Sequence, residues 1–366
     1  MNILTLMGVQ HTLPVRRRKF NRVLRSTATC LVFTSFVVWV VVPLVFHYSP
    51  RVQRFFIFLN TVGSQVDLSK PESVGLLGTR NFYMTTDKDV SVGIWHILPG
   101  SLVQFAPDIG SSERDLWYEQ SLRDSKPVIL YLHGNKGTRG EHHRIELYRV
   151  LREMDYHIIT FDYRGYADSS AVDPDEDGLV MDTKALFNYL LDNAGTSPVF
   201  VWGHSLGTGV SCHAVSELCM EKKCPQGLVL EAPFNNLQDE VRLNPLSQVF
   251  YHLPYFDWAF VDPLQDIGAE FQSDKHIVHI TSPVIILHAQ DDYVVPIELG
   301  QKLQLAAQQR QLPEEYSLKF VAFDGKFGYG HNNIPKAPEF IAVIRDFVSS
   351  AERIGKKQRT NMNQNV

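Results

Sequence analysis

Short apolar runs alternate with helix-length segments through most of the chain, and this pattern limits the fold more than any other feature. The runs consist mainly of Val, Ile, Leu and Phe without a polar face, which is typical of parallel strands covered by helices on both faces of a sheet. They lie at residues 128–132, 157–161, 199–202, 228–230, 284–287 and 318–323, with helix-length segments at 141–154, 179–193 and 208–220. Two β-rich runs at 81–86 and 90–98 precede them as a hairpin. We expect an α/β fold with a mostly parallel central sheet and helices on both faces.

One motif, Gly203-His204-Ser205-Leu206-Gly207, lies between one of these strands and the helix that follows it. Chance alone supplies this five-residue pattern in about one chain in ten of this length, so the flanking elements carry the inference. A strand, a tight turn with flanking glycines and a helix form the nucleophile elbow of the α/β-hydrolase fold, which presents a serine hydroxyl at the carboxyl edge of the sheet. We therefore predict this fold, with Ser205 as the nucleophile.

A serine nucleophile needs a base, and the base needs an acid that orients it. Asp292 follows the strand that ends near residue 288, and His331 lies in a glycine-rich loop after the last strand. Both follow Ser205 in the order that this fold uses, so we predict Asp292 as the acid and His331 as the base. Asp291 is an alternative acid, and His288 is a rival base, although it closes a buried strand and is typical of a core histidine.

The tetrahedral intermediate of acyl transfer needs backbone donors for its oxyanion. The amide of Leu206, next to the nucleophile, is one expected donor. The amide of Asn135 is the other, because the loop after the strand at 128–132 reads His-Gly-Asn-Lys-Gly. An ordinary glycine turn is the alternative interpretation of that loop. This chemistry requires no metal and no organic cofactor, so we expect neither.

Charged residues follow two of the strands in the oxyanion region. We expect Asp162 and Arg164 to pair and hold their loop rather than take part in chemistry. A second group just past the oxyanion loop has two interpretations, contact with an anionic head group or a solvated helix start; its members are Arg139, His142, His143 and Arg144.

Residues 26–50 contain no charged side chain and are strongly apolar at their centre. Twenty-five helical residues span roughly 37 Å, enough for a hydrocarbon core of about 30 Å. We predict a transmembrane anchor over 26–50, preferred to a cleavable signal peptide or a buried helix because no cleavage site follows and no face is polar. Six basic residues precede the run, so the positive-inside rule predicts that residues 1–25 are a basic cytosolic tail and that the catalytic domain lies across the membrane.

The remaining segments complete the predicted organisation. Residues 51–75 form a linker whose aromatic part, 51–59, either lies along the membrane interface or packs on the domain. The hydrolase domain covers 76–350, with a lid insertion at about 235–281 whose aromatics either line an acyl channel or pack over the core. Residues 351–366 are a polar tail without a core-forming pattern, which we expect to fray.

Composition excludes some partners. The net charge of −5 includes six basic residues ahead of the apolar run, so the rest of the chain carries a larger negative charge. A negatively charged domain repels phosphate backbones, and nucleic acid is therefore not an expected partner. Four cysteines match neither a disulfide scaffold nor a zinc-ligand spacing, and we interpret them as buried thiols rather than a functional pair.

Five motifs together resemble one family, that of α/β-hydrolase domain-containing protein twelve and its close relatives, from about residue 78 to 347. They are the His-Gly-Asn loop at 133–135, Asp-Tyr-Arg-Gly at 162–165, Gly-His-Ser-Leu-Gly-Thr-Gly at 203–209, Leu-His-Ala-x-Asp-Asp-x-Val-Val-Pro at 287–296 and Gly-Tyr-x-His at 328–331. The resemblance implies a membrane-anchored lipase for lysophosphatidylserine and monoacylglycerols, with an active site facing the endoplasmic reticulum lumen or the cell exterior. It also implies that Ser205, Asp292 and His331 are the catalytic residues.

Three residues depart from the family pattern, which has a small residue at Lys136, a glycine at Ala167 and an arginine at Gly330. None of them removes a catalytic group, but Lys136 and Gly330 leave the head-group preference open. A protein acyl-thioesterase and a non-catalytic hydrolase-fold protein that binds a lipid or a partner are the alternative functions. The oligomeric state is not predicted.

Overall fold

The computed structural model describes residues 13–63, 66–108, 110, 112–316 and 318–364. Its centre is a sheet of eight strands in the order β1-β2-β4-β3-β5-β6-β7-β8. The strands are β1 (Thr79–Asp87), β2 (Val90–Ile97), β3 (Val128–Leu132), β4 (His157–Phe161), β5 (Val199–His204), β6 (Gly227–Glu231), β7 (Val284–Ala289) and β8 (Lys319–Phe323). β2 pairs antiparallel with β1 and β4, and every pairing from β4 to β8 is parallel. The predicted mostly parallel sheet, opened by a hairpin, is confirmed.

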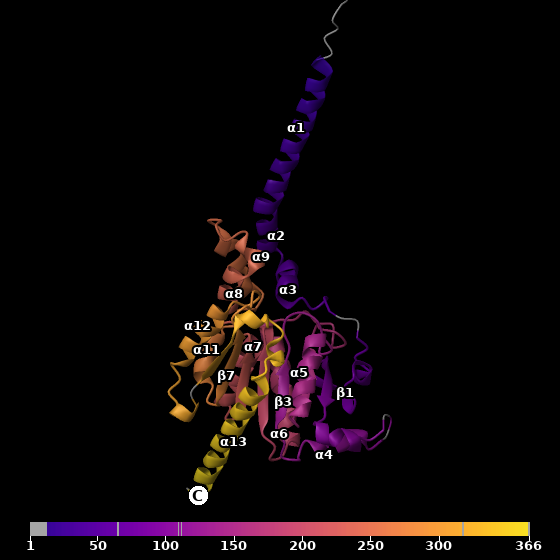
Figure 1. Ribbon diagram of the computed structural model, residues 1–366, viewed down its shortest axis with the longest axis vertical. Helices are drawn as coiled ribbons and strands as arrows, with labels where there is room; N and C mark the ends of the chain where they lie inside the picture. The colour runs from indigo at the N-terminus through magenta and orange to yellow at the C-terminus, as the bar shows by residue number, and fades with distance from the viewer. Residues whose placement is uncertain (1–12, 64–65, 109, 111, 317, 365–366) are drawn as a thin grey trace, which may run out of the picture.

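Helices cover both faces of this sheet. The longer ones are α4 (Arg114–Ser121), α5 (His142–Glu153), α6 (Glu176–Asn193), α7 (Leu206–Met220), α12 (Ile297–Ala307) and α13 (Phe340–Gln364). One apolar core joins the sheet to α6, α7 and α12, and a second joins its other face to α5 and α13. Figure 1 shows α5 and α13 in front of the sheet, with α7 and α6 behind. β3 to β7 have no exposed residue, which explains why their sequences are apolar on both faces.

A long helix leaves this domain at the N-terminal end of the chain (Figure 1). It consists of α1 (Leu13–Phe36), a π-helical stretch η1 (Val37–Val41) and α2 (Val42–Tyr48). Residues Arg22–Tyr48 of it are long and apolar enough to cross a membrane, and few of them are buried. α3 (Pro50–Phe58) follows with one face packed on the domain and Phe55 and Phe56 exposed on the other. One face of α3 therefore packs on the domain, and contact of the other face with a membrane interface stays a prediction.

The insertion between β6 and β7 forms a cap of short helices. It comprises α8 (Leu237–Leu243), α9 (Pro245–Gln248), η4 (Asp257–Val261), α10 (Pro263–Asp266), α11 (Ser273–His276) and η5 (Ile277–His279). Asn236 caps α8, because its side-chain oxygen accepts the amide of Asp239 at 2.8 Å. α8 and α9 lie beside α2, where the long helix meets the domain (Figure 1). Further one-turn helices are η2 (Pro71–Val74), η3 (Gly100–Phe105), η6 (Glu314–Tyr316), η7 (Gly325–Phe327) and η8 (Ile334–Lys336).

Two expectations from the sequence need correction. The polar tail does not begin as a frayed segment at residue 351, since α13 continues to Gln364 and buries Ala351 and Ile354 in the core. The cysteines are not all buried thiols, because Cys219 in the last turn of α7 forms a disulfide with Cys224 in the loop that follows. Cys212 is the buried thiol that was expected.

Candidate active site

Ser205 occupies a tight turn between β5 and α7. Its φ of 53° and ψ of −120° are unfavourable for a side chain other than glycine, and neighbouring structure holds the turn in place. A Cβ on Gly203 would lie 2.3 Å from the Gly207 carbonyl oxygen, and one on Gly207 would lie 2.2 Å from that of Leu132. The Ser205 amide donates to the Glu231 carbonyl of β6 at 3.0 Å. The strand, turn and helix expected of a nucleophile elbow are therefore present at this serine.

Asp292 and His331, the predicted acid and base, lie side by side in the structure. His331 Nδ1 lies 2.7 Å from Asp292 Oδ2. The other carboxylate oxygen accepts the amides of Val294 and Val295, both at 2.9 Å. Burial raises the pKa of Asp292, but the hydrogen bond and charge of His331 and the Val295 amide outweigh it, so the pKa lies below its ordinary value. Asp292 is thus ionised at neutral pH and can orient His331.

The two alternative residues make different contacts. Asp291 Oδ2 accepts the amide of Gly330 at 3.0 Å and so supports the loop that carries His331. His288 is fully buried, and its Nε2 lies 2.9 Å from the Val295 carbonyl oxygen. It behaves as the core histidine that was the alternative interpretation of this position.

His204 connects the nucleophile turn to the His331 loop. Burial and the adjacent His331 lower its pKa well below the ordinary value, so the imidazole is neutral. Its Nε2 lies 3.0 Å from the His331 carbonyl oxygen and must be the protonated nitrogen. This contact brings the residue beside Ser205 against the backbone of His331, a role that the motif alone did not indicate.

The loop after β3 supplies the second expected oxyanion donor. Asn135, Leu206 and Ser205 line one cavity, so the two predicted donor residues lie around the predicted nucleophile. Within the described part of the chain, neither the Asn135 nor the Leu206 amide donates to another residue. Both are therefore available to a negatively charged oxygen.

Two buried arginines hold this loop in place. Arg144 donates to the carbonyls of Lys136, at 2.6 Å, and of Thr138. Arg139 contacts Asp162, 2.5 Å away, and Asp168, 2.6 Å away. Neither arginine lines the cavity or is solvated, so both interpretations of the 139–144 group are wrong for these two residues.

The expected pair of Asp162 and Arg164 does not form. Asp162 joins Arg139 and lies 3.3 Å from His133 Nε2, whereas Arg164 joins Asp182 of α6 at 2.8 Å. The loop-holding role expected of both residues is present, but each has a different partner. Residue Ala167 in the same region has a φ of 48°, a left-handed conformation that suits the glycine of the family pattern better than alanine.

A cavity of about 230 Å³ opens onto Ser205. Its walls are mainly apolar side chains from three parts of the chain, namely the N-terminal helices, the cap and the loops at the carboxyl edge of the sheet. Phe250 and Phe260 of the cap line it, whereas Phe271 packs in the main core. Some aromatic residues of the cap therefore line the cavity and others pack in the core, so each of the two interpretations holds for part of the cap.

Two carboxyl groups in the region of this cavity, the half-buried Glu240 and the buried Glu231, were not singled out from the sequence. Burial raises the pKa of Glu240, which lines the cavity, to about 7. Burial likewise raises the pKa of Glu231, at the end of β6, to about 7, and its carboxylate accepts the Trp202 Nε1 hydrogen at 3.0 Å. Only their tertiary surroundings distinguish these glutamates from exposed ones.

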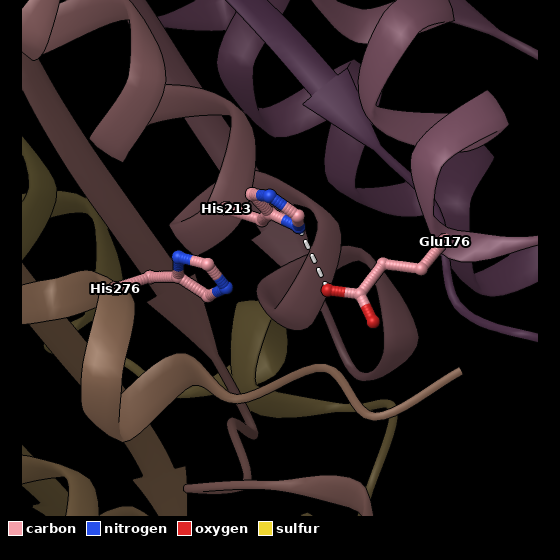
Figure 2. Close-up of side chains that lie close together, drawn as sticks. All are labelled: Glu176, His213 and His276. Carbon is pink, nitrogen blue, oxygen red and sulfur yellow. Dashed lines mark hydrogen bonds and ion pairs between the residues drawn. The ribbon is translucent and has the colours of Figure 1, made fainter. Parts of the chain in front are cut away.

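One group of side chains away from the cavity has metal-ligating types. Figure 2 shows Glu176 of α6, His213 of α7 and His276 of α11 close together, and their ligand atoms lie within 4.8 Å of one another. The carboxylate already accepts His213 Nδ1 at 2.8 Å and the amides of Glu270 and Phe271 at 3.0 and 2.7 Å. The two imidazoles stack at 4.0 Å and 15°, so their in-plane lone pairs do not converge on one ion. We interpret the group as a clamp that joins the end of the cap to α6 and α7.

Comparison with known proteins agrees with this architecture. Residues 127–257 match the family model described as alpha/beta hydrolase fold. Among solved structures, the esterase Pf2001 of Pyrococcus furiosus superposes with a TM-score of 0.54 at 19% identity, over 79% of this chain and 94% of that one. This likeness concerns the fold alone.

Sequence relatives are much closer. The chain is 42% identical to lysophosphatidylserine lipase ABHD12 of Xenopus tropicalis, over 86% of this chain and 81% of that protein. It is 38% identical to protein ABHD12B of Homo sapiens, over 78% and 76% of the two chains. At this identity and coverage, the chain belongs to the ABHD12 family, and it is a serine hydrolase with the α/β-hydrolase fold.

Proposed function

We propose that this protein is a membrane-anchored serine lipase that hydrolyses the carboxylic ester of lysophosphatidylserine and of monoacylglycerols. The observation that carries the proposal is the joint placement of Ser205, Asn135 and Leu206 on an apolar cavity, with the Asp292 and His331 pair joined to the Ser205 turn through His204. The similarity to lysophosphatidylserine lipases supports the lysophospholipid substrate.

The proposed mechanism is acyl transfer through an acyl-serine intermediate. His331 takes the proton of the Ser205 hydroxyl while Asp292 stabilises the imidazolium that forms. The Ser205 oxygen attacks the ester carbonyl, and the amides of Leu206 and Asn135 hold the oxyanion. His331 then protonates the leaving alcohol, and a water molecule activated by the same histidine releases the fatty acid.

The membrane arrangement is part of the proposal. Arg22–Tyr48 spans the bilayer of the endoplasmic reticulum, the basic N-terminal segment faces the cytosol and the hydrolase domain faces the lumen. The length and apolar character of the helix and the excess of basic residues before it support this orientation. The Cys219–Cys224 disulfide also supports it, because such bonds persist in oxidising compartments.

The test expresses the full chain in cells that lack the endogenous protein and measures its activity in membranes prepared from these cells. Ser205→Ala should abolish labelling by a fluorophosphonate and hydrolysis of lysophosphatidylserine. Ser216→Ala is the matched control, since Ser216 lies on α7 and its hydroxyl has no partner among the described residues. Labelling of Ser205→Ala would refute the nucleophile. A wild-type protein that is labelled yet cleaves thioesters of acylated peptides, and neither lipid ester, would refute the substrate class.

A further inference from the structure

The N-terminal helix contributes a wall to the cavity that holds Ser205. Val42 and Phe46 of α2 line this cavity, as do Phe56 and Ile57 of α3. The cap provides the opposite wall with Leu246, Phe250 and Phe260. The cavity is thus partly enclosed by a segment that precedes the hydrolase domain by some thirty residues, and the site would be more open without this segment.

Direct contacts fix α2 against the cap. The rings of Phe46 and Phe260 lie 5.2 Å apart, and His47 stacks on Trp258 at 3.9 Å. His47 Nδ1 also lies 2.7 Å from the Trp258 carbonyl oxygen. About two turns earlier in the long helix, the Tyr255 hydroxyl donates to the carbonyl of Trp39 in η1 at 2.5 Å. These residues are more than two hundred positions apart in sequence, so the helix and the cap form one structural unit.

The bend between α2 and α3 is fixed as well. Gln53 is buried, and its side-chain amide donates to the carbonyls of Phe46 and His47 at 2.6 and 2.8 Å. These carbonyls belong to the last turn of α2, where a helix lacks internal donors. Gln53 therefore satisfies the end of α2 and sets the angle at which Phe46 faces the cavity.

The chemistry of the walls selects the part of a lipid that fits. Glu240 is the one ionisable side chain among the described residues that line the cavity, so nothing there offers a positive charge to a phosphate. An acyl chain suits these walls, and a chain that passes from the bilayer along α2 stays in apolar surroundings. A volume of about 230 Å³ lies below the roughly 300–1,000 Å³ of many ligand pockets, which favours one chain over two.

We propose that the end of the membrane helix is part of the substrate site and that Val42 and Phe46 set the acyl chain length that the enzyme accepts. The chain lies between α2 and the cap with its ester at Ser205, and the head group lies outside the apolar cavity. This inference rests on the proposed lipase function. Val42 is 40% exposed, so the wall continues onto the outer surface of the helix, where the chain enters.

The experiment compares variants in membranes with lysophosphatidylserines of 8 to 20 carbons. Phe46→Trp and Val42→Phe place larger side chains in the wall and so reduce the space for an acyl chain. The kcat/KM for the longest chains should therefore fall about tenfold relative to that for the shortest. Phe46→Leu should shift the preference toward longer chains. Phe33→Trp is the matched control, because Phe33 lies on the same helix with 66% of its side chain exposed and does not line the cavity. Its chain-length profile should equal that of the wild type.

A second series makes the result independent of the natural substrate. Fluorophosphonates with alkyl chains of the same lengths report the pocket through their rates of labelling, and the shortest probe measures the amount of folded enzyme. Equal effects of Phe46→Trp on all chain lengths, or a shift with Phe33→Trp, would overturn the proposed wall. If the probe series shifts but no lipid ester is hydrolysed, the proposed function fails while the wall stands.

Discussion

At the scale of single residues, the adjacent carboxylates of Asp291 and Asp292 bind different groups of the loop that carries His331. Asp292 bonds the imidazole, whereas Asp291 accepts the Gly330 amide. Asp292→Asn should lower kcat by about 10³–10⁴-fold, because an amide does not stabilise the imidazolium and favours the wrong tautomer. Asp291→Asn keeps an acceptor for the Gly330 amide, so it should lower kcat by less than about tenfold. Steady-state hydrolysis of lysophosphatidylserine measures both, and a larger loss in Asp291→Asn would reassign the acid.

Glu231 gives the folded enzyme a pH-dependent stability. Burial raises its pKa from 4.5 to about 7, so the folded state keeps a proton that the unfolded chain releases. The stability from this group is complete below pH 4.5 and is lost as pH rises through about 7. Glu231→Gln keeps an acceptor for Trp202 without a charge, so its free energy of unfolding should not fall in this way. The difference in the free energy of unfolding between variant and wild type should therefore rise by at most about 3 kcal/mol from pH 5 to pH 8.

The midpoint of thermal inactivation, followed by fluorophosphonate labelling at pH 5 and pH 8, measures this gain. Glu240 has a similarly raised pKa and contributes to the pH dependence of both proteins, so the difference between them isolates Glu231. A difference in midpoint that is the same at both pH values would show that Glu231 does not bind the proton.

At the scale of elements, some of the fold follows from local sequence and some does not. β3 and β4 match their predicted bounds, since strands covered on both faces are apolar throughout. Ser205, Asp292 and His331 could be predicted as catalytic residues because each follows a recognisable strand. The partner of Asp162 was not, because Arg164 is near in sequence while Arg139 reaches Asp162 only through the pairing of β3 with β4. Glu240 lines the same cavity as Val42 and Phe46 of α2, some two hundred residues earlier, and no local sequence pattern records this proximity.

The oxyanion loop should be sensitive to the loss of Arg139. Arg139→Met leaves the buried Asp162 without its cation, which should lower the free energy of unfolding by about 3–5 kcal/mol. Arg149→Met is the control, because Arg149 donates from an exposed position to the Val74 carbonyl and should cost less than about 1 kcal/mol. Thermal inactivation in detergent compares the two variants. Adding Asp162→Asn to Arg139→Met should recover part of the loss, and no recovery would argue against an unpaired charge as its cause.

At the scale of the whole molecule, the long helix, the cap and the catalytic edge of the sheet form one continuous assembly (Figure 1). α2 packs on η4 of the cap, and the cap lies over Ser205. The exposed aromatics Phe55, Phe56 and Tyr251 lie on α3 and the cap, the parts of the domain that meet α2. If the helix is embedded in a bilayer as proposed, the contacts between α2 and the cap connect the cavity at Ser205 directly to the membrane.

The proposed orientation makes a prediction about the cysteines of the intact protein. If the domain is lumenal, the Cys219–Cys224 bond forms in the endoplasmic reticulum, and both residues should resist alkylation after denaturation until a reductant is added. Cys212 is the internal control, since it is a free thiol and should be alkylated after denaturation without reduction. Mass spectrometry of differentially alkylated peptides distinguishes these states.

Protease treatment of sealed microsomes tests the same orientation independently. A tag after the C-terminal residue should be protected until detergent is added, whereas a tag at the N-terminus should be digested from outside. A cytosolic domain would instead be digested at its C-terminus and would leave Cys219 and Cys224 open to alkylation without reduction. Because the excess of basic residues before the helix and the disulfide are unrelated features, agreement of both assays would place Ser205 in the lumen on two independent grounds.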